Sequence, residues 1–182
     1  MEYNGEIILR DAYRLLCLIV ADKAIYDMTP EDQQVWGRSR PSEEVLFRLH
    51  HTFTDEEISH ALINLAIFNR THMDNEKQRH NIDYPDAVCG QLRKNVDSKF
   101  ENWIALTFRE ACNKVIHAEQ LSFTFLKEGV VASFVDNNGP MEPMHHEVWL
   151  SGEQSKKGWL AKLDVLKFIR ATTNNFARVH SL

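Results

Sequence analysis

The chain has 182 residues, of which 43% are hydrophobic and 26% charged, and it carries a net charge of −5. This composition predicts one folded globular domain and excludes a disordered or collagen-like chain. The negative charge argues against binding nucleic acid through overall attraction. The most lipid-like stretch, residues 15–21, is far shorter than the roughly 20 apolar residues that span a bilayer. Glu2 and Glu6 stand where a signal peptide would be basic, so we expect a cytoplasmic protein without a membrane segment.

Cysteines and histidines give no pattern typical of a metal site. Cys17, Cys89 and Cys112 form no CxxC pair, and we expect buried free thiols rather than a disulfide or a metal site. Nine histidines are present, but HExxH and zinc-finger spacings are absent. The motifs GxxxxGK[ST], GxGxxG and GxSxG are also absent, so phosphate-binding loops and a hydrolase nucleophile lack their sequence signals. We expect neither metal nor cofactor.

Hydrophobic periodicity predicts helices through the first half of the chain. Residues 5–27 form the first helix, and residues 27–41 form a loop or a short broken helix. A second helix begins at Ser42, and a third follows a capping box at Thr54-Asp-Glu-Glu57. Residues 71–84 are polar and aperiodic, which predicts an exposed loop. A further helix is expected to begin at Pro85 and either to run through Leu92 or to break near Gly90.

The longest predicted helix spans about residues 96–119. Its apolar residues step by four, four, three, four and three, which is typical of a core-facing helical stripe: Phe100, Ile104, Phe108, Ala111, Val115 and Ala118.

After Gln120 the pattern changes to short strands. Residues 121–125 alternate with period two, and residues 130–135 favour a strand. Two segments, 147–151 and 158–163, read as a strand pair, and Asp164 caps a closing helix. The predicted fold is α+β and mainly α in a single domain, 1–182. It comprises a helical bundle over 1–120, an antiparallel β-meander over 121–163 and a closing helix over 164–180.

One candidate site lies late in the predicted helix 96–119. Arg109, Asn113 and His117 are spaced at i, i+4 and i+8, which places them on one arc of roughly 80°. Imidazole can move a proton near neutral pH, and guanidinium stabilises negative phosphoryl charge. Together with an orienting amide, they would suit metal-free RNA cleavage by a ribose 2′-hydroxyl. Any polar helix face can also supply such a triplet as plain surface.

A second candidate surface is the basic C-terminal segment. Residues 156–182 contain six basic residues and one acid, a local charge of +5. This segment could meet phosphate, or it could be a solvated helix face. A helix-turn-helix over 42–70 has little support, since Asn64, Asn69 and Arg70 are its main contact candidates.

The segment Asn113-Lys-Val-Ile-His117 resembles the active-site motif of the HEPN superfamily. That motif is usually an arginine, a polar residue (often asparagine), three variable residues and a histidine. Asn113 matches the polar position and His117 the histidine. Cys112 occupies the expected arginine position, and Arg109 lies one turn earlier. The resemblance covers at most residues 5–120 and leaves the β-rich segment unexplained.

The resemblance implies one of two functions. The first is a metal-independent endoribonuclease of a toxin–antitoxin or defence system. It would act as a homodimer whose two His117 side chains line one cleft, with RNA as substrate and a protein antitoxin as a further partner. In it, Arg109 would hold the phosphate, Asn113 would orient it and His117 would transfer a proton or stabilise charge. The second is a non-catalytic interaction or accessory module with a degenerate site, which Cys112 favours.

Overall fold

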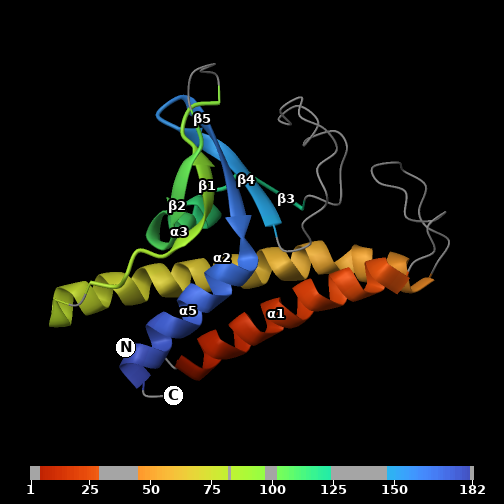
Figure 1. The fold of residues 1–182 in the computed structure, drawn as a ribbon, viewed down its shortest axis with the longest axis horizontal. Coiled ribbons are helices and arrows are strands. Elements are labelled where there is room, and N and C mark those ends of the chain that lie inside the picture. The colour runs from red at the N-terminus through yellow and green to blue at the C-terminus, as the bar shows by residue number, and fades with distance from the viewer. Residues whose placement is uncertain (1–4, 29–44, 82, 97–101, 124–146, 181–182) are drawn as a thin grey trace.

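The computed structural model describes residues 5–28, 45–81, 83–96, 102–123 and 147–180 (Figure 1). Within these ranges the chain is mixed helix and sheet, and mainly helical. The helices are α1 (Gly5–Met28), α2 (Val45–His80), α3 (Phe108–Ile116) and α5 (Val165–His180). The strands are β1 (Val88–Arg93), β2 (Ile104–Thr107), β3 (Gln120–Phe123), β4 (Glu147–Gln154) and β5 (Lys157–Asp164).

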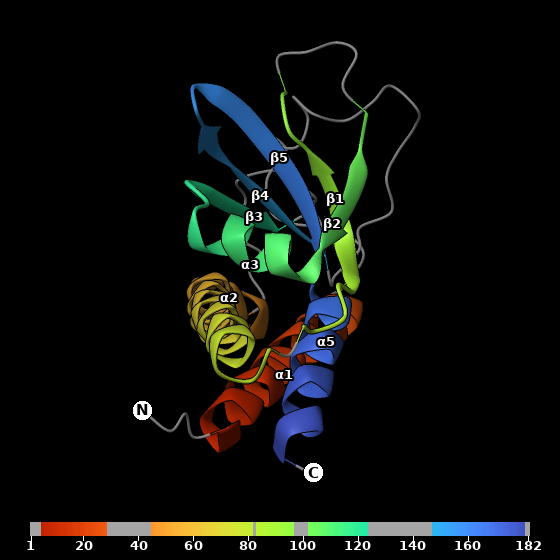
Figure 2. The same cartoon turned by 90° about the vertical axis from the view of Figure 1, so that its left-hand side faces the viewer.

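The five strands form one antiparallel sheet in the order β2-β1-β5-β4-β3. β5 lies at its centre and pairs with β1 (Leu92 opposite Ala161) and with β4 (Leu150 opposite Ala161). Figure 2 shows the sheet above a layer made by α1, α2 and α5, with α3 between the sheet and α2. The molecule therefore has a helical layer and a sheet layer that share one core.

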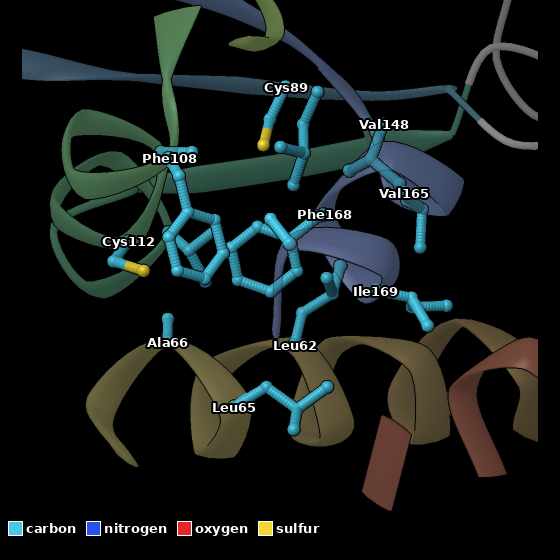
Figure 3. Packing of buried hydrophobic residues seen from close by; sticks show 14 of the residues in the cluster. Leu62, Leu65, Ala66, Cys89, Phe108, Cys112, Val148, Val165, Phe168 and Ile169 are labelled. Atoms are coloured by element: carbon cyan, nitrogen blue, oxygen red, sulfur yellow. The ribbon is translucent and has the colours of Figure 1, made fainter. Parts of the chain in front are cut away.

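The core lies where α2, α3 and α5 meet the sheet. Phe108 of α3 and Phe168 of α5 are fully buried, with ring centroids 5.2 Å apart. Leu62 and Leu65 of α2 approach them from the helical layer (Figure 3). Burying each side chain of this size contributes about 1.5–3 kcal/mol, so this contact fixes where α3 sits.

The predictions for the C-terminal half are confirmed in its described part. β3 and the β4–β5 pair lie where alternation placed strands, and Asp164 Oδ1 accepts a hydrogen bond from the Lys167 N–H at 3.0 Å, as a helix cap does. The predicted core residues of the closing helix are buried: Val165, Phe168, Ile169, Thr172 and Phe176. The expected strand over 130–135 lies outside the described residues, and so do residues 29–41 of the loop or short broken helix expected over 27–41.

Three predictions in the N-terminal half are wrong. The two helices expected from Ser42 and Thr54 form one 36-residue helix, α2, which also includes residues 71–80 of the predicted loop. No glycine or proline interrupts residues 45–80, and Met73 is buried against the core, so the helix continues. Residues 88–93 form β1 instead of a helix. β1 and β2 therefore lie inside the segment expected to be an all-helical bundle up to residue 120.

Glycine at position 90 is what lets β1 pair closely with β5. The register of β1 against β2 shifts between Val88 and Gly90. A Cβ atom at Gly90 would lie 1.9 Å from the carbonyl oxygen of Lys162. Gly90, near which one of the two alternatives ended the predicted helix, therefore allows a bulged strand to approach its neighbour.

Candidate functional site

Helix α3 is much shorter than the predicted helix 96–119. It begins at Phe108, directly after β2, and ends at Ile116. His117 is the C-cap residue, and its backbone N–H donates to the Asn113 carbonyl oxygen at 3.1 Å. The His117 side chain is exposed at the helix end. The nine residues of α3 nevertheless keep the predicted core stripe, because Phe108, Ala111 and Val115 are all buried.

Cys112 faces the core and not the candidate site. Its side chain is fully buried, and burial raises the pKa of its thiol well above the usual value. This is the position at which the HEPN motif has its arginine. An arginine here would bury its guanidinium among apolar side chains, which carries a large desolvation cost. The expectation of a buried free thiol is confirmed for Cys89 and Cys112, but it is wrong for Cys17, which is exposed.

Arg109 lies on α3, but its side chain contacts α2 instead of the surface shared by Asn113 and His117. Its guanidinium forms an ion pair with Asp74 of α2. The same carboxylate also binds Arg70, at 3.3 Å. Arg109 therefore links α3 to α2 and does not line the surface on which the other two predicted residues meet.

Asn113 and His117 do lie together, in a polar depression between α3 and the β4–β5 hairpin. The depression has a volume of about 580 Å³ and is lined by Glu110, Asn113, Lys114, His117, Glu119, Glu153, Gln154 and Trp159. Beyond α3, the N–H of Glu119 donates to the Ser151 carbonyl oxygen of β4 at 2.9 Å. This bond holds the segment after α3 against the sheet and forms one side of the depression.

Lys114 is the buried charge of this site. Its side chain is 8% exposed, and Nζ lies 3.5 Å from Glu110 Oε1. Nζ also donates to Gln154 Oε1 at 3.2 Å and sits 4.4 Å from the centre of the Trp159 ring. A carboxylate, an amide and an indole face together compensate the ammonium group for its lost hydration.

Gly152 makes room for the indole that covers Lys114. Gly152 of β4 pairs with Trp159 of β5. A Cβ atom at Gly152 would lie 2.6 Å from Trp159 Cζ2 and 3.0 Å from the His117 carbonyl oxygen. The ring therefore lies across the glycine, and the hairpin and the end of α3 are packed as one unit.

The charge of the depression is negative. Three glutamates line it against one lysine, which gives a formal charge of −2 when His117 is neutral. Asn113 Nδ2 donates to Glu110 Oε2 at 3.4 Å, so its amide is oriented by an acid. The depression can accept hydrogen bonds and receive cations better than it can hold a phosphodiester.

Sequence reasoning found Asn113 and His117 but missed Lys114, Gln154 and Trp159. The i, i+4 spacing of Glu110 and Lys114 was visible in the sequence, and it is typical of a helix ion pair. No sequence pattern connects residues 152–159 with α3. The β4–β5 hairpin meets α3 only in the folded protein, through contacts between residues about 40 positions apart. The missed residues could therefore be found only with the fold in hand.

The lysines of the basic C-terminal segment differ in their surroundings. Lys162 Nζ lies over two indoles, 4.4 Å from the Trp149 ring and 4.9 Å from the Trp103 ring. Lys167 Nζ forms an ion pair with Asp164 at 3.0 Å. Lys156 and Lys157 lie at the β4–β5 turn. These lysines have separate structural surroundings.

Among the residues that the structure describes, no group of three or more His, Cys, Asp or Glu side chains is placed to hold a metal ion. In the same ranges, no helix is long and apolar enough to cross a membrane. Comparison with protein-family models, with curated proteins and with solved structures gave no significant match.

Proposed function

We propose that the protein is a non-catalytic binding module whose depression beside α3 receives a basic or neutral polar segment of a protein partner. The placement of Arg109 carries this proposal, since its guanidinium forms an ion pair with Asp74 and does not line the depression. The remaining cation, Lys114, is already bound by Glu110 and Gln154. A phosphodiester entering here would meet three carboxylates, whereas a lysine or arginine side chain would be attracted by them.

The second candidate is the HEPN-like, metal-independent endoribonuclease acting as a homodimer. It is favoured by Asn113 and His117, which line the same accessible depression. In this reading His117 transfers a proton or stabilises charge, Asn113 orients the phosphate, and Arg109 exchanges Asp74 for RNA. The acids of the depression count against it, because phosphate would have to approach them.

Cleavage of RNA separates the two candidates. The wild type, His117→Ala and a control variant, His80→Ala, are incubated with a mixed RNA pool in EDTA. His80 is exposed at the end of α2, away from the depression. A binding module leaves the RNA intact in all three reactions. Fragments ending in 2′,3′-cyclic phosphate that disappear only with His117→Ala would establish the ribonuclease instead.

A direct binding measurement tests the preference for basic partners. Fluorescence anisotropy compares a labelled arginine–glycine octapeptide with an octauridylate. We expect tighter binding of the peptide, and at least tenfold weaker peptide binding after Glu119→Lys with Glu153→Lys, since about 1.4 kcal/mol corresponds to a factor of ten. Each of the two single variants, Glu119→Lys and Glu153→Lys, is also compared with Glu76→Lys on α2, which makes the same change of charge outside the depression. Tighter binding of the oligonucleotide by the wild type would contradict the proposal.

A further inference from the structure

The outward face of α2 carries an apolar seam that nothing described covers. Six residues follow one another at spacings of four, three, four, three and four, and we call them the outer α2 seam: Leu49, Phe53, Glu56, His60, Ile63 and Ile67. The four apolar ones are 57%, 57%, 37% and 46% exposed, respectively. The opposite face of the same helix is buried through Ile58, Leu62 and Leu65. Alternating three- and four-residue spacing is the pattern with which one helix packs along another.

The seam is accessible along its length. Figure 2 shows α2 at the edge of the molecule, with α3 above it and α1 to one side below. All six residues of the seam are exposed. Between Leu49 and Ile67 the helix rises by about 27 Å, which is long enough for an extended helix–helix contact.

The order of residues in the seam is symmetric about position 58. Suppose that a second copy of α2 packs antiparallel against the first, and that the two-fold axis crosses the seam between Glu56 and His60, level with position 58. Leu49 then faces Ile67 of the second copy. Phe53 then faces Ile63 of the second copy, and Glu56 faces His60 of the second copy. Apolar residues meet apolar residues at both ends, and the acid meets the base at the centre. An interface with a two-fold axis requires this kind of self-complementarity.

The charges beside the axis do not oppose this packing. Glu57, which flanks the centre of the seam, forms an ion pair with Arg14 of α1. Its negative charge is therefore compensated inside each copy. Ser59, on the other flank, is small and uncharged. The polar centre of the interface therefore consists of two Glu56–His60 pairs, and the apolar residues of the seam lie on either side of it.

We propose that the protein forms a homodimer through antiparallel packing of two outer α2 seams. The occupant of the seam is a second copy of this chain, because the seam places apolar residues opposite apolar residues and the Glu56 carboxylate opposite the His60 imidazole. This dimer does not rest on the proposed function, since no residue of the seam lines the depression beside α3. It also differs from a dimer that would bring two α3 helices together.

The test measures the mass of the full chain by sedimentation equilibrium across a concentration series. We expect a dimer for the wild type. Phe53→Lys should give a monomer, because it places two cations in the apolar ends of the seam. Val20→Lys is the matched control, since Val20 is an equally exposed apolar residue (59%) on α1. Circular dichroism confirms that each variant is folded.

A charge exchange tests the antiparallel pairing itself. His60→Glu places a glutamate opposite Glu56 of the second copy at two symmetric positions, and it should raise the dimer Kd at least tenfold. Adding Glu56→Lys to this variant restores two opposite-charge pairs and should return the Kd to the wild-type value or lower it. The rescue depends on contact across the axis, so a purely structural role of either residue would not produce it.

Three results would overturn the proposal. The first is a wild type that stays monomeric up to about 1 mM, a concentration equivalent to only about 4.1 kcal/mol of binding. The second is a dimer that survives Phe53→Lys or is lost with Val20→Lys. The third is a doubly exchanged variant that dimerises as weakly as His60→Glu alone.

Discussion

His117 is exposed at the end of α3, and its backbone N–H donates to the Asn113 carbonyl oxygen. Removing the ring should therefore leave no buried group unpaired. We expect His117→Ala to change the free energy of unfolding by no more than about 0.5 kcal/mol, as surface substitutions usually do. Urea unfolding measures this change. Phe108→Ala provides the contrast, because emptying a buried aromatic site costs about 3–5 kcal/mol. A loss above about 1 kcal/mol for His117→Ala would indicate a packed histidine.

The three thiols should differ sharply in reactivity. Burial raises the pKa of Cys89 to about 12 and raises that of Cys112 further, whereas Cys17 is exposed on α1. The thiolate is the reactive form. A disulfide reagent at pH 8 should modify one thiol in the native protein and all three in denaturant. Rapid modification of two or three native thiols would contradict the burial of Cys89 and Cys112.

The raised pKa of Cys89 makes the free energy of unfolding depend on pH. In the unfolded chain the Cys89 thiol ionises near its ordinary value of 9.0, and in the folded protein near 12. Its contribution to stability is thus fully present below pH 9 and is lost as the pH rises toward 12. We expect the unfolding free energy of the wild type to fall over this window more steeply than that of Cys89→Ala. Equal slopes would contradict the shift.

At the scale of elements, the segment 100–119 shows what periodicity could and could not predict. Phe108, Ala111 and Val115 step by three and four, which only a helix face explains, and they are buried in α3. Phe100, Ile104 and Phe108 step by four, and a step of four keeps residues on one face of a strand as well as of a helix. The helix was therefore predicted correctly for Phe108–Ile116, whereas Ile104–Thr107 forms β2.

Capping signals were similarly ambiguous. Thr54-Asp-Glu-Glu57 has the residues of a capping box, yet Thr54 is buried inside α2. A capping box marks a helix start only where the chain before it leaves the helix, and residues 45–53 remain helical. Asp164, in contrast, follows a strand, and its prediction as a cap is confirmed.

The turn between β4 and β5 offers a gain in stability. Ser155 and Lys156 have φ values of 53° and 63°, and Gln154 pairs with Lys157. Two-residue turns of this kind favour Asn-Gly, because other residues are strained at positive φ. We expect Ser155→Asn with Lys156→Gly to stabilise the protein by about 1 kcal/mol, measured from the urea midpoint. Lys156→Ala, which keeps the strain, should bring no gain, and a loss with the double variant would contradict the turn.

At the scale of the whole molecule, a buried hydrogen bond joins two helices that are far apart in sequence. Asn69 Nδ2 of α2 donates to Thr172 Oγ1 of α5 at 3.1 Å and to the Leu65 carbonyl oxygen at 2.7 Å. We expect Asn69→Ala to cost about 1–3 kcal/mol, because it leaves buried polar groups without this partner. Thr172→Val tests the bond from the other side. The two changes together should cost about 0.5–1.5 kcal/mol less than their sum, and strict additivity would contradict the contact.

The position of β5 at the centre of the sheet has a consequence for synthesis of the chain. Leu92 of β1 pairs with Ala161 of β5, so about 70 residues must be translated before one edge of β1 finds its neighbour. At about 5–20 residues per second, this takes roughly 4–14 s. Helices α1 and α2 and the β1–β2 ladder have all left the ribosome by then, with the hydrogen-bonding groups of β1 still open to other chains. The nascent polypeptide therefore depends on the synthesis of β5 to close the sheet, and ribosome pausing before residue 157 would lengthen its exposure to aggregation.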